Sequence, residues 1–319
     1  MQPEPLPKVS STPPPVSFYR FYFTLTAPSF LGKKFSMPRS PPPDTMTSRF
    51  LFAKEACWDI MKENAVDFYF FSGTGNTLLA ARAVAEELRK GGKTVRIRRI
   101  EKGFVPLPEG TALGIAVPAA MFSTYPFVWE FLEALPDGDE RGAFLVSTMG
   151  GASGALRPAV KRLLEQKNYS PLGARDFVMP SNYANTSIPE EENREKTESM
   201  KMEAAKFAAG LLEGEAGWKR GTVLWPLLYS LSRKAFPWRL MHRKFPLDVD
   251  RSRCIQCGKC ARLCPVKNIR MAEFPEFQDH CVSCQRCMAF CPPEAINVRG
   301  KNYSRYRSVE YYDLISENL

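Results

Sequence analysis

The chain has 319 residues, enough for two or three domains, and 44% of them are hydrophobic, so at least one full core can be buried. No apolar run reaches the roughly 18 residues of a membrane-spanning helix, and nothing resembles a secretory signal peptide. We therefore expect a reducing, cytoplasmic setting, in which the thiolates of the nine cysteines are available to metals. The formal net charge of the chain is +10.

Residues 1–60 form a head rich in proline and serine, with runs of three prolines at 13–15 and 41–43. This composition cannot bury enough apolar surface to fold, so we expect no packed structure there. A second hypothesis is that part of the head is never translated, because Met46 and Met61 both offer start sites. Cys57, outside any motif, is predicted to be a free thiol without function.

Residues 61–213 alternate between short apolar runs and helical patterns. Such runs predict buried parallel strands, and the patterns between them predict the helices that connect these strands. The strands are expected at 66–71, 94–97, 112–117, 143–147 and 175–179, and the helices at 75–90, 125–135, 154–166 and 190–212. Five strands alternating with helices predict an α/β fold with a doubly wound, five-stranded parallel sheet.

The loop between the first predicted strand and helix is rich in glycine and hydroxyl groups. Its backbone N–H groups and the helix N-terminus can form a cradle for a terminal phosphate. It lacks the lysine of a Walker A loop, and Leu78 stands where a dinucleotide fingerprint needs its third glycine. The loop residues are Ser72, Gly73, Thr74, Gly75, Asn76 and Thr77.

Residues 214–247 break the alternation with many aromatic and basic side chains. We interpret this stretch as a connector whose aromatic residues dock two domains. A docking face for an acidic redox partner and a membrane surface stay open as alternatives. Pro226 and Pro237 argue against one continuous amphipathic helix.

Eight cysteines fall within 38 residues, in two copies of the pattern Cys-x-x-Cys-x-x-Cys-x-x-x-Cys-Pro. This pattern predicts two 4Fe-4S clusters, with the fourth cysteine of each copy bound to the other cluster. Zinc fits poorly, because zinc sites use two Cys-x-x-Cys pairs separated by a longer loop. One cluster is assigned to Cys254, Cys257, Cys260 and Cys291, and the other to Cys281, Cys284, Cys287 and Cys264.

This block is similar to bacterial two-cluster ferredoxins over residues 248–299, which implies a small α+β domain, placed here at 248–300. The fourth cysteine of each copy is expected on the short helix that follows the first three. Residues 301–319 are a tail to which no role is assigned. The small apolar core is expected to contain Ile255, Val266, Ile269, Val282 and Ile296.

The loop from Ser72 to Thr77 resembles the phosphate loop of flavodoxins. This resemblance implies FMN, with its phosphate on the loop and its ring at the carboxyl edge of the sheet. Glycines in the 147–154 loop would let the backbone approach the ring. For Met121 and Phe122, a role as ordinary core residues is as good an interpretation as contact with the ring. The expected ring contacts are Met121, Phe122, Tyr125, Met149, Gly150, Gly151, Asn182 and Tyr183.

Over about residues 63–300, the two halves together resemble the flavodoxin–ferredoxin fusions called EFR-family ferredoxins. The motifs that carry this resemblance are the Ser72 loop, the 118–126 loop, the 149–151 and 180–183 segments, and the cysteine block. The resemblance implies electron transfer through FMN and two 4Fe-4S clusters. We expect a redox partner protein or a small-molecule redox substrate.

Nucleic acid is not expected as a partner, because two oxidised clusters and a flavin phosphate would lower the charge from +10 to about +4. Neither His242 nor His280 lies in the flavin-like half, so no catalytic residue is assigned. Two alternatives stay open. They are a flavin-dependent oxidoreductase acting on a small substrate, and a cluster-based regulatory protein.

Overall fold

The computed structural model describes residues 63–182, 187, 189–218 and 224–316. All of them belong to one compact unit of the chain. The proline-rich head, Cys57 and Tyr183 lie outside the described residues. In the part that is described, none of the helices is both long and apolar enough to cross a bilayer.

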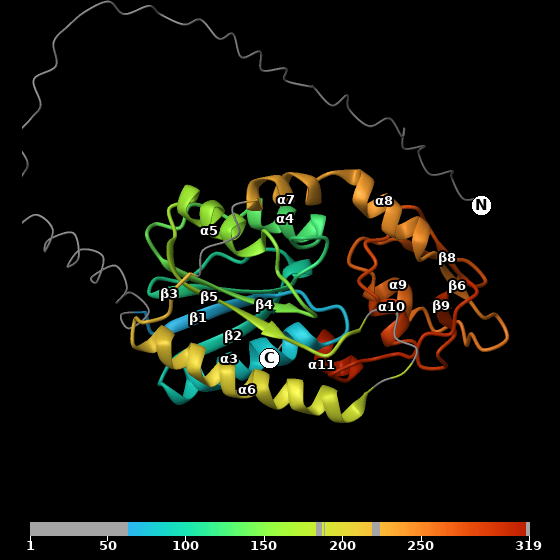
Figure 1. Cartoon of the computed structure of the whole chain (residues 1–319), viewed down its shortest axis with the longest axis horizontal. Coiled ribbons are helices and arrows are strands. Elements are labelled where there is room, and N and C mark those ends of the chain that lie inside the picture. Colours follow the sequence, from blue (N-terminus) through green and yellow to red (C-terminus); the bar gives the residue numbers. More distant parts are fainter. Residues whose placement is uncertain (1–62, 183–186, 188, 219–223, 317–319) are drawn as a thin grey trace, which may run out of the picture. The chain divides into compact units, whose positions relative to one another are not determined.

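The five predicted strands form one parallel sheet in the order β2-β1-β3-β4-β5 (Figure 1). They are β1 (Ala65–Phe70), β2 (Thr94–Arg99), β3 (Thr111–Pro118), β4 (Gly142–Met149) and β5 (Ser170–Val178). This is the flavodoxin-like order, in which the crevice between the carboxyl ends of β1 and β3 receives the ligand. Strand β5 begins earlier than predicted, because an edge strand tolerates Pro171 and half-exposed side chains that break an apolar run.

The four predicted helices of this half are confirmed, and they cover both faces of the sheet (Figure 1). Helices α3 (Asn76–Lys90) and α6 (Glu190–Leu212) lie on one face, and α4 (Pro126–Glu133) and α5 (Leu156–Gln166) on the other. Strands β2 and β3 are joined through a single 3-10 turn, η2 (Ile100–Lys102).

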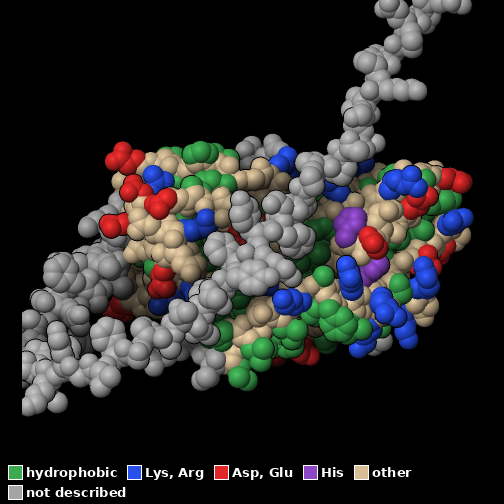
Figure 2. All heavy atoms as spheres, turned by 90° about the horizontal axis from the view of Figure 1, so that it is seen from above, with side chains coloured by type: hydrophobic (Ala, Val, Ile, Leu, Met, Phe, Trp, Pro, Cys, Tyr) green, Lys and Arg blue, Asp and Glu red, His purple; other side chains and the backbone are tan. Residues whose placement is uncertain are grey.

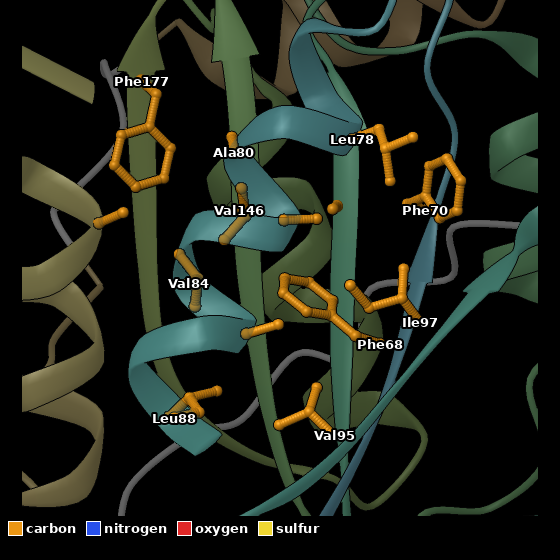
Figure 3. Packing of buried hydrophobic residues seen from close by; sticks show 14 of the residues in the cluster. Phe68, Phe70, Leu78, Ala80, Val84, Leu88, Val95, Ile97, Val146 and Phe177 are labelled. Atoms are coloured by element: carbon orange, nitrogen blue, oxygen red, sulfur yellow. The ribbon is translucent and has the colours of Figure 1, made fainter. Parts of the chain in front are cut away.

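Alternate residues of β1 feed the two cores, as the period of a strand requires. Phe68 and Phe70 pack beneath α3, whereas Tyr69 and Phe71 belong to the core under α4 and α5. Figure 3 shows Leu88 and its neighbours on α3 turned toward the phenylalanines of the sheet. The first strand therefore ends between two packed layers, which fixes the position of the loop that follows it.

The connector forms two short helices, α7 (Trp225–Ser232) and α8 (Ala235–Lys244). Pro226 and Pro237 each lie in a first helical turn, where the missing N–H removes no helix bond. The Tyr229 ring packs edge-on against Trp129 of α4, with their centroids 5.0 Å apart. The predicted break in the connector is confirmed, and its aromatic residues do contact the sheet domain.

The cysteine-rich half is a small α+β unit in which β6 pairs with β9 and β7 with β8, both antiparallel. Its elements are β6 (Leu247–Val249), α9 (Lys259–Leu263), β7 (Ile269–Met271), β8 (Pro275–Phe277), α10 (Arg286–Ala289) and β9 (Ile296–Val298), followed by α11 (Tyr311–Ile315).

Two expectations about this half are wrong. The short helices carry the third cysteines, Cys260 and Cys287, and not the fourth. Cys264 is extended because it precedes Pro265, and a residue before proline avoids the helical region. Ile255 is 64% exposed, since it lies on an outer loop between two cysteines, whereas Ile269, Val282 and Ile296 are buried as expected.

The two halves share their hydrophobic cores. Leu263 and Phe290 of the cysteine-rich half belong to the cluster that includes α3 and α6. Val282 and Cys284 belong to the cluster beneath α4 and α5. Contacts of this kind fix the cysteine-rich half against the carboxyl edge of the sheet.

Candidate cofactor sites

A cavity opens at the carboxyl edge of the sheet. Five of the six residues of the predicted phosphate loop line it, together with the segments that follow β3, β4 and β5. Helix α8 and the cysteine loop 282–285 complete the wall. The predicted ring contacts that line it are Met121, Tyr125, Met149, Gly150 and Asn182.

The phosphate loop turns directly into α3 at Gly75, whose φ of 107° lies in a region that favours glycine. The Ser72 hydroxyl accepts a hydrogen bond from the Gly75 N–H at 3.1 Å, which closes the turn. The N–H groups of the first turn of α3 have no carbonyl partner within the helix. Together with the helix dipole they make an anion cradle beside the cavity.

Three side chains tie the phosphate loop to its neighbours. The Thr74 hydroxyl accepts a hydrogen bond from the Asn182 amide, and the Asn76 amide donates to a backbone carbonyl, both at 2.9 Å. The Thr77 and Thr148 hydroxyls lie 2.7 Å apart. These bonds hold the cradle and the later loops in one rigid arrangement.

Phe122 and Gly151 lie away from the cavity wall, and the Phe122 side chain is 53% exposed. The Phe122 carbonyl accepts a hydrogen bond from the Ala155 N–H at 2.7 Å. A Cβ atom on Gly154 would stand 2.4 Å from that carbonyl oxygen. Gly154 therefore lets two loops meet, while Gly150 of the same loop lines the cavity.

Helix α8 supplies Trp238 and Met241 to the cavity wall, which the sequence interpretation did not assign to the site. The centroid of the Trp238 ring lies 5.6 Å from that of Tyr125, so an aromatic pair closes this side. The only sequence signal was the excess of aromatic residues in the connector.

The second cysteine motif approaches the phosphate loop closely. Residues 282–285 line the same cavity, and a Cβ atom on Gly73 would stand 2.3 Å from the Cys284 carbonyl oxygen. Only glycine fits at position 73 without displacing this backbone. The spacing of the cysteines does not reveal this contact.

Arg286, between two cysteines of the second motif, is 3% exposed. Its guanidinium donates two hydrogen bonds to the Ser72 carbonyl, at 2.7 and 3.0 Å, and forms an ion pair with Glu101. It also lies over the Phe71 ring, 4.5 Å from its centroid. This side chain therefore joins the second motif to the end of β1.

The tail after β9 folds back onto the phosphate loop. The Ser308 N–H donates to the Thr74 carbonyl at 2.9 Å, and the Tyr306 hydroxyl donates to the Asn76 side-chain oxygen at 3.0 Å. Asp313 of α11 pairs with Arg82 of α3 at 3.1 Å. No role was assigned to this segment, because it contains no motif that could indicate one.

The eight cysteines line two separate, small cavities of similar size. Each cavity takes three cysteines from one motif and the fourth from the other. Cys254, Cys257, Cys260 and Cys291 line the first, and Cys264, Cys281, Cys284 and Cys287 line the second.

The internal repeat is visible in the backbone. Three positions in each motif have a positive φ, and the two sets are displaced by 27 residues. Residues of this conformation turn the chain sharply, so that both motifs wrap their cavities in the same way. The pairs are Gln256 and Ser283, Gly258 and Gln285, and Lys267 and Glu294.

Backbone N–H groups donate to the fourth cysteines at equivalent positions. The Asn268 N–H lies 3.1 Å from Cys264 Sγ, and the Ala295 N–H lies 3.3 Å from Cys291 Sγ. Burial raises the pKa of Cys284 to about 12, while the nearby Arg286 charge acts in the opposite direction. Metal binding must therefore displace a proton that burial holds on this thiol.

Comparison with known proteins agrees with this division of the chain. A family model described as a 4Fe-4S binding domain matches residues 247–270, and a second with the same description matches residues 278–305. A search of curated proteins found no match.

Among solved structures, an archaeal flavodoxin is 12% identical, with a TM-score of 0.33, over 46% of this chain and 98% of its own. A flavodoxin from Megasphaera elsdenii is 22% identical, with a TM-score of 0.31, over 44% of this chain and 98% of its own. A flavo di-iron protein from Thermotoga maritima is 14% identical, with a TM-score of 0.30, over 50% of this chain and 40% of its own. By its own strand order and these domain matches, the chain joins a flavodoxin-like half to a ferredoxin-type 4Fe-4S binding half.

Proposed function

We propose that this chain is a cytoplasmic electron carrier that holds one FMN and two 4Fe-4S clusters, as EFR-family fusions do. Its donor and acceptor are redox proteins or small redox-active molecules. The observation that carries this proposal is the shared cavity, whose wall contains both the phosphate loop and the cysteine loop with Cys284.

The residues around the cavity at the carboxyl edge of the sheet fit FMN. The cradle at the start of α3 offers backbone N–H groups and hydroxyls to a phosphate, and it carries no glycine pattern for a dinucleotide. Tyr125, Trp238 and Met241 supply the flat apolar wall that an aromatic ring needs. Polar groups at one end and apolar groups at the other match a flavin mononucleotide.

The residues around the two smaller cavities fit 4Fe-4S clusters. Each cavity offers four thiols, and this number and ligand type are those of a cubane. The N–H groups of Asn268 and Ala295 already donate to sulfur, as is usual around such clusters. We propose that the cysteines around each cavity are the ligands of one cluster.

When bound, a flavin can exchange one or two electrons, whereas an iron–sulfur cluster exchanges one at a time. The chain itself positions and shields these groups. Trp238 and Tyr125 exclude water from one side of the cavity, and Gly73 lets the cysteine loop contact the phosphate loop. Neither histidine is among the described residues of the cavity wall, which favours a carrier over an enzyme with an acid–base step.

Anaerobic purification with chemical analysis tests the proposal. We expect about eight irons, about eight acid-labile sulfides and about one FMN per chain. Zinc in place of iron, or flavin absent after reconstitution with FMN, would refute it. Rapid mixing with NADPH separates the alternatives, because fast bleaching without a partner protein would indicate an enzyme.

Substitution of Gly73 by alanine should weaken FMN binding at least tenfold. The added Cβ would stand 2.3 Å from the Cys284 carbonyl, so the cysteine loop must move away from the cavity. Gly151→Ala is the matched control, because its Cβ would meet nothing within 4 Å. Fluorescence titration with FMN measures both variants. Equal affinities for the two would contradict the close contact between the loops.

A further inference from the structure

The outer faces of α7 and α8 carry a concentration of exposed apolar side chains. Of the eleven large hydrophobic residues that are exposed in the described part of the chain, five lie between residues 224 and 240. Their exposed fractions range from 43% to 69%. Scattered apolar residues are ordinary on a protein surface, but a contiguous group indicates an interaction site. The five are Leu224, Leu227, Leu231, Phe236 and Leu240.

Helical spacing places these side chains in a stripe on each helix. Leu224 is the N-cap residue of α7, and Leu227 and Leu231 follow it at three and four residues along the helix. Phe236 and Leu240 are four residues apart on α8. The opposite faces are anchored in the protein. Trp238 is buried, and its indole N–H donates to the Ser232 carbonyl at 2.9 Å.

Basic side chains surround the stripe. Lys234, Arg239 and Arg243 are exposed, and none of them has a carboxylate within ion-pairing distance among the described residues. Arg233 differs, because it pairs with Glu133 of α4 at 2.8 Å. No aspartate or glutamate occurs from residue 216 to residue 247. Figure 2 looks onto the face that carries α7 and α8, where green hydrophobic and blue basic side chains lie beside each other.

We propose that this α7–α8 face binds the surface of an anionic lipid bilayer. Interfacial helices combine leucine and phenylalanine on one side with lysine and arginine beside them, and residues 216–247 contain no acidic residue of their own. Glu133 of α4 lies beside α7, and Arg233 pairs with it. An acidic protein would be complementary to the charges alone. The prominence of five large apolar side chains favours lipid, in which each can be buried without a matching pocket.

Vesicle co-sedimentation of the anaerobically purified, cofactor-loaded chain tests this proposal. The vesicles contain either phosphatidylcholine alone or phosphatidylcholine with 30% phosphatidylglycerol. We expect binding to the anionic vesicles that falls steeply with salt, and at least tenfold weaker binding to the neutral ones. Each basic residue near an anionic surface contributes about fivefold. Binding to neither kind of vesicle, or equally to both, would overturn the proposal.

Two patch variants locate the contact. Leu227→Glu with Leu231→Glu, and Lys234→Glu with Arg239→Glu, should each lower binding to anionic vesicles at least tenfold. Met202→Glu is the matched control, since this methionine is 62% exposed on α6, on the opposite side of the sheet. The visible absorbance of each variant must equal that of the wild type, which shows that folding and cofactors are intact.

The same variants distinguish other occupants of the face. If the wild type is a dimer by light scattering, the leucine variant is a monomer, and neither binds vesicles, a second copy of the chain covers this face. If the wild type binds an acidic redox protein and not vesicles, the face docks a protein. Either result overturns the membrane proposal.

Discussion

Replacing Cys254 and Cys291 together by alanine is expected to remove no more iron than replacing either one, about four of the expected eight atoms per chain. Both cysteines line the same cavity, although they belong to different copies of the motif. Replacing Cys254 and Cys264 together should remove all eight irons, although these cysteines belong to one copy. Their side chains line different cavities.

This comparison separates the interleaved arrangement from one in which each motif binds its own cluster. In the second arrangement the two double variants would exchange their results. Iron and acid-labile sulfide are measured on anaerobic samples, and low-temperature electron paramagnetic resonance of the reduced protein counts the remaining clusters. Cys57→Ala, outside both motifs, is the control and should keep all of the iron. A loss of only four irons in both double variants would contradict both arrangements, because each predicts that one of the variants loses all eight.

The sheet domain could be predicted because its signals are local. Each buried strand is a short apolar run, and α3 shows apolar residues at helical spacing that end at Gly91. The phosphate loop and the cysteine motifs are local as well. In each of these elements, the residues that determine the local structure lie within a few positions of one another in the sequence.

The parts that escaped prediction depend on contacts between distant segments. Trp238 reads as one more aromatic residue of a connector, and Tyr306 as part of a tail, until the fold brings Trp238 to the cavity wall and Tyr306 to Asn76 of the phosphate loop. Gly154 reads as one more glycine of a flexible loop, yet its requirement comes from the Phe122 carbonyl. Contacts between distant segments produce no periodic pattern or fixed spacing in the sequence from which they could be predicted.

The strand edges and helix ends also show where local patterns fail. Strand β5 lies at the edge of the sheet, so Pro171 and half-exposed residues are tolerated in its first part. The fourth cysteine of the first motif was expected on a helix, but Pro265 ends that helix beforehand. In the second case the sequence itself carries the signal, since Pro265 directly follows Cys264.

Substitution of Arg286 by leucine should lower the stability of the holo-protein by about 3–5 kcal/mol, because it leaves a buried carboxylate without its partner. The side chain of Glu101 is 16% exposed and pairs with this guanidinium. The variant also removes two hydrogen bonds to the Ser72 carbonyl. For a chain of this size we expect the melting midpoint to fall by about 6–20 °C.

Arg270→Leu is the matched control in the same half of the chain. Arg270 also pairs with a glutamate, Glu276, but its side chain is 72% exposed. Exposed pairs contribute less than about 1 kcal/mol, so this variant should melt within about 3 °C of the wild type. Equal shifts for the two variants would contradict a special role for the buried pair.

Two further variants identify which of the contacts of Arg286 matters. Adding Glu101→Leu to Arg286→Leu removes the stranded carboxylate and should recover part of the lost stability. Arg286→Lys keeps the charge, but a lysine cannot donate twice to the Ser72 carbonyl in the geometry of a guanidinium. We therefore expect it to melt near the wild type while FMN binding weakens several-fold. Recovered stability without recovered FMN affinity in the double variant would show that the stranded carboxylate of Glu101 causes the loss of stability, whereas the bonds to Ser72 hold the phosphate loop in place.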